Sequence, residues 1–131
     1  MRRKTERILE DLGCSSSSII SIAIVDNSEM AELNFNYRGK EGPTNVLSFS
    51  QSEGEKFPQP GLLGDVVISG DRASDDALQL NYTTEEMVLY LLIHGILHLI
   101  GYEHQKPDEA VTMEQKVEQI FQSFYDSKVM A

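Results

Sequence analysis

Residues 83–104 decide the fold of this chain, and they read TTEEMVLYLLIHGILHLIGYEH. Thr83 followed three residues later by Glu86 is a capping box, which predicts that a helix begins here. The helix then runs to Ile100 and is apolar on almost every side, so we expect it to be buried at the centre of the molecule. Gly101 can adopt the left-handed conformation that ends a helix and turns the chain back.

All three histidines of the chain lie in this segment, at His94, His98 and His104. His94 and His98 are four residues apart and therefore lie one turn apart on the same face of a helix. The turn at Gly101 can bring His104 toward them as a third ligand. Three neutral imidazoles suit a zinc ion, and three protein ligands leave a position for water, as in catalytic zinc sites. The alternative is that one or two of the histidines only form hydrogen bonds inside the core.

Gly95 stands inside this helix, directly after the first histidine. Glycine costs about 1 kcal/mol relative to alanine in a helix, which indicates that another chain segment or the substrate approaches closely, or that packing is simply tight. The spacing of the histidines and Gly101 also matches the metzincin metalloproteases. Those enzymes carry a glutamate as general base where this chain has Gly95, so the sequence argues against a peptidase of that class.

The rest of the sequence predicts a small sheet and further helices around this segment. Apolar alternation predicts strands at 19–25, 45–50 and 63–69, and amphipathic patterns predict helices at 3–12, 28–37 and 71–80 and a last helix from Pro107. We expect Ser28 to cap the second helix, and Met30, Leu33 and Tyr37 to point inward. The fold class is therefore α+β: one domain of residues 1–131, with a small mixed β-sheet packed by helices and a buried central helix that carries the His94–His98 pair.

The composition limits the partners and the compartment. The net charge is −10, and such a field repels nucleic acid, so binding of RNA requires a local basic patch. Arg38 with Lys40, and the basic residues within 2–7, are two candidate patches, with ordinary solvated surface as the alternative for each. The single cysteine, Cys14, excludes an intramolecular disulfide and fits a reducing compartment, so we expect a cytoplasmic protein. We expect neither a signal peptide nor a membrane span.

The run from His94 to His104 resembles the signature of the YbeY family of bacterial metal-dependent endoribonucleases, with Glu103 where that family has an aspartate. Residues 37–49 and 63–68 resemble two further blocks of the same family. The resemblance implies one zinc ion on the three histidines, an RNA substrate, and a role in ribosomal RNA maturation and ribosome quality control. The family usually has one more strand before the first helix, so we expect a sheet one strand short or a start codon placed differently.

The resemblance also implies that the arginine corresponding to Arg38 is important for activity. We expect Arg38 to hold phosphate oxygens through its planar guanidinium, with Lys40 beside it in substrate binding, and His98 to act in catalysis with the metal. Glu103 is a candidate for orienting a ligand or relaying a proton. Ser48 is expected to face either the cleft or the core.

Three functions are compatible with these observations. The first is a zinc-dependent endoribonuclease that prefers single strands and acts on ribosomal RNA. The second is a non-catalytic ribosome-assembly factor whose zinc-binding domain docks on the small subunit or on ribosome-associated proteins, which suits an acidic chain. The third is a metal-dependent hydrolase of another substrate.

Overall fold

The computed structural model describes residues 2–14, 18–42, 44–50, 62–102 and 106–130, with the backbone alone for residues 62 and 125–130. Its elements follow one another in this order: α1 (Arg2–Asp11), β1 (Ile19–Val25), α2 (Asn27–Arg38), β2 (Val46–Ser50), β3 (Leu62–Ser69), α3 (Gly70–Leu80), α4 (Thr84–Leu99) and α5 (Pro107–Met130). The predicted helices and strands are present with ends close to those expected. No helix within these ranges is both long enough and apolar enough to cross a bilayer.

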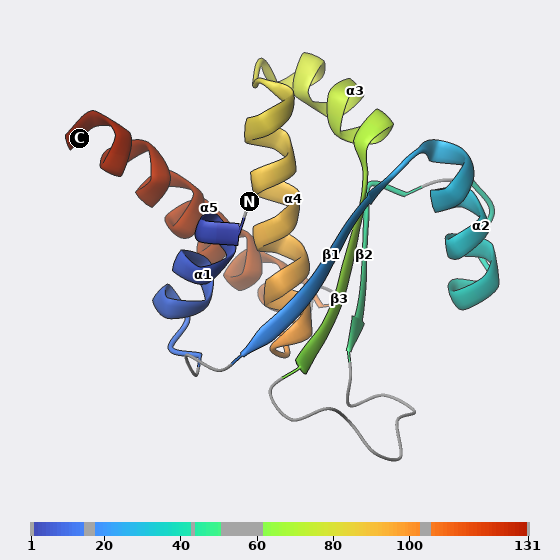
Figure 1. Cartoon of the computed structure of the whole chain (residues 1–131), viewed down its shortest axis with the longest axis horizontal. Coiled ribbons are helices and arrows are strands. Elements are labelled where there is room, and N and C mark those ends of the chain that lie inside the picture. Colours follow the sequence, from blue (N-terminus) through green and yellow to red (C-terminus); the bar gives the residue numbers. More distant parts are fainter. Residues whose placement is uncertain (1, 15–17, 43, 51–61, 103–105, 131) are drawn as a thin grey trace.

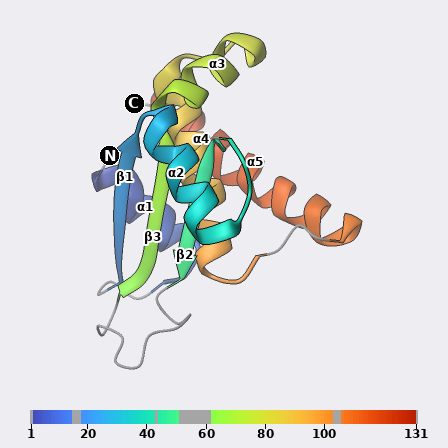
Figure 2. The same cartoon turned by 90° about the vertical axis from the view of Figure 1, so that its right-hand side faces the viewer.

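The sheet is mixed, as predicted. Its strand order is β1-β3-β2, with β1 parallel and β2 antiparallel to the central strand β3. Helices α1, α4 and α5 lie on one face of the sheet and α2 lies on the other, as Figure 1 and Figure 2 show. Helix α3 crosses the end of the sheet at which β3 finishes, close to the start of α4 (Figure 1). The arrangement confirms the α+β class.

Helix α4 lies at the centre of the main core. Its capping box is formed, because Thr83 Oγ1 accepts from Glu86 N at 3.1 Å and Glu86 Oε1 accepts from Thr83 N at 2.8 Å. Most residues between Met87 and Leu97 are buried, and they pack against α1, β3 and α5. Past the helix end, Gly101 has a φ of 108°, a conformation that favours glycine. The predicted central helix and its glycine turn are therefore confirmed.

A second, smaller core lies on the other face of the sheet, where Met30 of α2 packs against Leu47 and Val67. The prediction that Ser28 caps α2 is wrong, because Asp26 occupies the cap position and its Oδ1 accepts from Glu29 N at 2.8 Å. Ser28 is instead an exposed residue inside the first turn.

The inward face of α2 also differs in part from the expected one. Met30 and Leu33 point toward the sheet as predicted, but Tyr37 is 68% exposed. The Tyr37 ring rests edge-on against Phe49, with 5.1 Å between ring centroids, at the surface of the sheet. The polar residue Asn34, one turn after Met30, takes a buried position and is 4% exposed.

Helix α4 approaches the sheet closely at Gly95. A Cβ atom at this position would lie 2.7 Å from Val66 Cγ1 and 3.2 Å from Ser48 Oγ, both shorter than ordinary contacts. Ser48 Oγ also donates a hydrogen bond to Gly95 O at 2.9 Å. Strands β2 and β3 therefore press directly on the helix backbone, which gives the physical reason for a glycine inside a buried helix.

Candidate functional site

A cavity of ≈ 390 Å³ brings together side chains from α2, β2 and α4. Arg38 enters it from the end of α2, and His94 and His98 enter it from the last two turns of α4. The remaining lining residues come from the segment 44–48, Ser50 and Leu99. Arg38 and the two histidines, which were predicted as site residues from two distant segments of the sequence, thus meet in one cavity.

The two histidines are immediate neighbours in this cavity. Their ring centroids are 5.0 Å apart with an interplanar angle of 70°, and both side chains are half-buried. Within the described ranges, no group of three His, Cys, Asp or Glu side chains is placed to hold a metal ion. The third predicted ligand, His104, and the neighbouring Glu103 lie outside the described residues. The three-histidine ligand set and the role of Glu103 therefore stay predictions.

Arg38 owes its position to the way α2 ends. Gly39 adopts a left-handed conformation, with a φ of 65°, and its N–H donates to Phe35 O at 3.0 Å. Asn34 then holds the following loop, because its Nδ2 donates to Gly42 O at 2.8 Å. The result places Arg38 at the rim of the cavity, where its side chain is exposed to solvent.

Lys40, predicted to bind substrate beside Arg38, is exposed in the loop after α2. It is not one of the residues that line the cavity at His94 and His98. A contact with a substrate that extends past the rim stays a prediction for this residue.

Several residues of the site could not be picked out from the sequence. Thr44, Asn45 and Ser50 line the cavity. Thr44 and Asn45 lie in the block 37–49 that resembles the family, and Asn45 and Ser50 are the end residues of the strand predicted at 45–50, but neither signal pointed to a role in the site. Asn34 gave only a weak indication, because it is a polar residue on the same helix face as the inward-facing Met30, one turn later. Ser48 fulfils both expectations, because it lines the cavity and also hydrogen-bonds to the backbone of α4.

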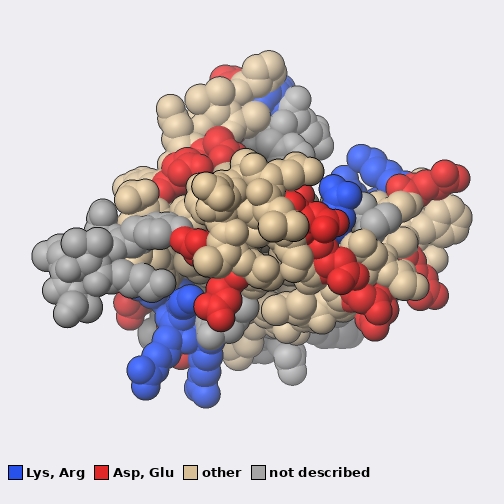
Figure 3. Space-filling view, turned by 90° about the horizontal axis from the view of Figure 1, so that it is seen from above, with Lys and Arg blue, Asp and Glu red and all other residues tan. Residues whose placement is uncertain are grey.

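The charge around the cavity is locally different from that of the whole chain. Acidic side chains are spread over the face seen in Figure 3, and the basic ones stand in small separate groups near its outline. Among the described residues that line the cavity, however, Arg38 is the charged side chain and no Asp or Glu is present. The cavity is therefore suited to an anionic group in spite of the net charge of −10.

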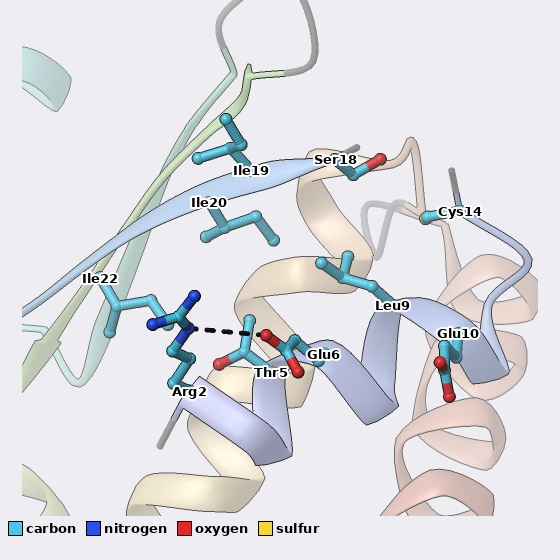
Figure 4. A pocket seen from close by; sticks show the side chains of 10 residues that line it. All are labelled: Arg2, Thr5, Glu6, Leu9, Glu10, Cys14, Ser18, Ile19, Ile20 and Ile22. Atoms are coloured by element: carbon cyan, nitrogen blue, oxygen red, sulfur yellow. Dashed lines mark ion pairs between the residues drawn. The ribbon is translucent and has the colours of Figure 1, made fainter. Parts of the chain in front are cut away.

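A larger groove, of ≈ 850 Å³, runs between α1 and the edge strand β1. Figure 4 shows Leu9 of α1 and Ile20 of β1 pointing toward each other across it, with an ion pair of 3.6 Å between Arg2 and Glu6 at its rim. Cys14 lies at one end and is half-buried. Among the described residues this groove shares no lining residue with the cavity at the histidines, so its size alone does not make it part of that site.

Arginine binds anionic groups through paired hydrogen bonds, and histidine is a frequent catalytic group, so this cavity of an α+β protein has the groups that an enzyme acting on an anionic substrate needs. The chain belongs to the endoribonuclease YbeY family, because the family model described as "Endoribonuclease YbeY" matches residues 1–125. This match confirms the resemblance found in the sequence.

Relatives named "Endoribonuclease YbeY" are similar over most of the chain. The protein from Syntrophus aciditrophicus is 41% identical over 124 residues, covering 92% of this chain and 77% of the relative. The protein from Syntrophotalea carbinolica is 40% identical, covering 92% of this chain and 82% of the relative. The protein from Sulfurihydrogenibium sp. is 47% identical over 107 residues, covering 80% and 68%.

The fold is also found in a solved structure. The solution structure of TM1509 from Thermotoga maritima matches with a TM-score of 0.59 and 26% sequence identity, and the match covers 96% of this chain and 82% of that chain. The described helices and strands therefore belong to an architecture that has been observed in solution.

Proposed function

We propose that this chain is a metal-dependent endoribonuclease that cuts single-stranded regions of ribosomal RNA. The observation that carries the proposal is the cavity of ≈ 390 Å³ in which Arg38 meets His94 and His98. The family of the chain and the names of its relatives support the endoribonuclease activity and, with it, an RNA substrate. The metal, the preference for single strands and the ribosomal target are our own extension.

The residues of the cavity suit one zinc ion. His94 and His98 offer two imidazole nitrogens from neighbouring rings on the same helix face, and imidazole is a preferred ligand of zinc. We assign His104 as the third ligand, with Glu103 positioned to orient a ligand. When bound, zinc would supply Lewis acidity and activate a water molecule for attack on a phosphodiester.

Arg38 binds the phosphate group in this proposal. Its guanidinium can donate two parallel hydrogen bonds to phosphate oxygens and stabilise the charge that develops on them during cleavage. Lys40, in the loop that follows α2, adds positive charge for the neighbouring part of the RNA. The lining residues Thr44, Asn45 and Ser48 are uncharged, so they do not offset the attraction between these positive charges and a phosphate.

The biological setting we infer is maturation of ribosomal RNA and ribosome quality control in the cytoplasm. A chain with a net charge of −10 gains little from long-range attraction to bare RNA. Basic proteins of the small ribosomal subunit, or other ribosome-associated proteins, would supply the positive surface and bring the RNA to the cavity.

The experiment compares cleavage of a labelled single-stranded fragment of ribosomal RNA by zinc-loaded protein and by three variants purified in the same way. We expect His98→Ala to lose both zinc, measured by metal analysis, and cleavage. We expect Arg38→Lys to keep its zinc and lose activity by on the order of 100-fold, because a point charge replaces the planar fork. The matched control is Arg72→Lys, an exposed arginine on α3, which should cleave as the wild type does.

Three outcomes would contradict the proposal in whole or in part. Equal cleavage by the wild type and His98→Ala would identify a contaminating nuclease rather than this site. No cleavage by either, on free RNA and on ribosomal particles alike, would favour a non-catalytic assembly factor. Near-normal activity of Arg38→Lys would remove the role of this residue while leaving the histidine site in place.

A further inference from the structure

A second cavity, of ≈ 300 Å³, adjoins the candidate site on the other side of His94. Both cavities are lined by Asn45, Val46 and His94. The second one extends from these residues toward α3 and α5, where Asp76 and Glu114 contribute to its lining. Any polymer bound at the histidines can therefore reach it without crossing the molecule.

The lining of this second cavity is divided into an apolar and a polar part. Met87 and Leu91 of α4 are almost fully buried beneath it, and Leu80 of α3 is 56% exposed. The polar part consists of Asn45, Asp76, Gln79 and Glu114. An apolar surface with hydrogen-bonding groups on one side suits a flat heterocyclic ring whose edge is polar.

Two hydrogen bonds fix the polar part. Asn45 Nδ2 donates to Asp76 Oδ2 at 3.4 Å, and the Tyr90 hydroxyl donates to Glu114 Oε1. The Tyr90 ring is in turn packed edge-on against Phe121, with 5.4 Å between centroids. A carboxylate has room for further donors after accepting one hydrogen bond, so Asp76 and Glu114 remain able to accept from a ligand.

The charges of the two cavities are opposite. Arg38 lines the first, and Asp76 and Glu114 line the second. Two carboxylates repel a phosphate and attract hydrogen-bond donors. A nucleotide would thus place its phosphate on the Arg38 side of His94 and its base on the carboxylate side.

We propose that the second cavity is a nucleobase subsite that selects bases with an exocyclic amino group over uracil. Cytosine and adenine present an amino group that can donate to Asp76, as guanine can with its N2 amino group. Uracil has carbonyl oxygens on both sides of its single ring N–H, and these face the carboxylates unfavourably. The inference rests on the proposed endoribonuclease function, since it assigns the base next to the phosphate that Arg38 would hold.

The first test measures binding directly, without relying on cleavage. Cytidine 5′-monophosphate and uridine 5′-monophosphate are titrated into the protein, and the methyl NMR signals of Leu80, Met87 and Leu91 are followed. We expect cytidine monophosphate to shift these signals with an affinity about tenfold higher than uridine monophosphate, the size of one hydrogen bond to a charged acceptor. In Asp76→Asn this preference should fall below about twofold.

The matched control is Asp75→Asn, because Asp75 is the preceding residue on α3 but is exposed and does not line the cavity. It should keep the wild-type preference. Gln79→Ala changes an exposed residue of the cavity itself. We expect it to lower the affinity for cytidine monophosphate less than Asp76→Asn does.

The second test maps which bases flank the cuts that the wild type and Asp76→Asn make in a mixed-sequence single-stranded RNA. We expect uracil to be disfavoured at one position by the wild type and tolerated there by the variant. Equal binding of both nucleotides, or shifts confined to signals elsewhere, would overturn the subsite even if the RNA is cut. Selective binding without any cleavage would instead overturn the endoribonuclease proposal and leave the base pocket standing.

Discussion

Gly95 allows helix α4 to approach the sheet closely. A Cβ atom there would lie 2.7 Å from Val66 Cγ1, and Val66 is a fully buried, β-branched residue that cannot rotate away. We expect Gly95→Ala to lower the free energy of unfolding by about 1 kcal/mol. Overpacking costs about 1–3 kcal/mol, which outweighs the roughly 1 kcal/mol that alanine gains in a helix. Urea denaturation measures the change.

Gly70→Ala is the matched control for this substitution. Its Cβ would lie 3.3 Å from Ile24 Cγ2, and Ile24 is 54% exposed and free to move aside. This variant should be as stable as the wild type or slightly more stable. If Gly95→Ala unfolds at the wild-type urea concentration, close packing against β3 does not constrain this position.

The sequence predicted individual residues well where a local rule fixes their place. The spacing of His94 and His98 puts both on one helix face, and the structure shows their rings in contact. Asn34 and Tyr37 were predicted less well, because a hydrophobic pattern favours the aromatic ring for the inward position. Asn34 takes the buried position instead, and its amide hydrogen-bonds to Gly42 O. The spacing of apolar residues in a sequence gives no information about such a bond.

At the level of the element, Tyr90 and Glu114 join α4 to α5 by a hydrogen bond. Burial, followed by the hydrogen bond and the charge of Glu114, raises the pKa of the Tyr90 hydroxyl well above its usual value of 10.0. Below pH 10 the phenol is neutral in both the folded and the unfolded chain. Above pH 10 only the unfolded chain releases this proton, so the contribution of Tyr90 to stability should fall as pH rises.

Tyr90→Phe tests this linkage. We expect the stability difference between the wild type and Tyr90→Phe to shrink between about pH 9 and pH 11, because the variant lacks only this hydroxyl. The change should be smaller than the roughly 1.4 kcal/mol per pH unit of one full proton, since solvent screens a half-buried phenol. Urea denaturation at several pH values measures it, and a difference that stays constant would show that the phenol titrates alike in both states.

Several element boundaries were predictable because they carry local signals. The capping box at Thr83, the glycine at Gly101 and the proline at Pro107 each mark an end that the structure shows at that place. The strand order β1-β3-β2 was not predictable in this way, since pairing of distant strands depends on packing of the whole chain. The second cavity is a similar case, because it gathers Asp76 from α3 and Glu114 from α5 around the part of α4 between Met87 and His94.

At the level of the molecule, the conflict between a net charge of −10 and an RNA substrate is resolved locally. Among the described residues, no Asp or Glu lines the cavity at Arg38, and two acidic residues line the adjoining cavity. Composition alone argued against nucleic acid, and only the motif blocks, later confirmed by the family match, argued for it. The division of charge between the two cavities became visible only in three dimensions.

This division predicts a weak dependence of RNA binding on salt. Each phosphate contact with single-stranded nucleic acid contributes about −0.7 to the slope of log affinity against log salt concentration. If Arg38 and Lys40 make the contacts, the slope should lie between about −1 and −2 over roughly 50 to 200 mM salt. Fluorescence anisotropy of a labelled single-stranded RNA, with metal withheld to prevent cleavage, measures it.

The same measurement on two variants assigns the contacts. Arg38→Gln should flatten the slope by about 0.7, and Arg72→Gln, an exposed arginine on α3, should leave it unchanged. Binding that ignores salt would exclude phosphate contacts at Arg38. A much steeper slope that Arg38→Gln does not alter would move them to another basic group, such as the N-terminal residues 2–7. An acidic protein that cuts RNA must select its substrate mainly by short-range contacts, and a small slope that depends on Arg38 is the direct sign of that selection.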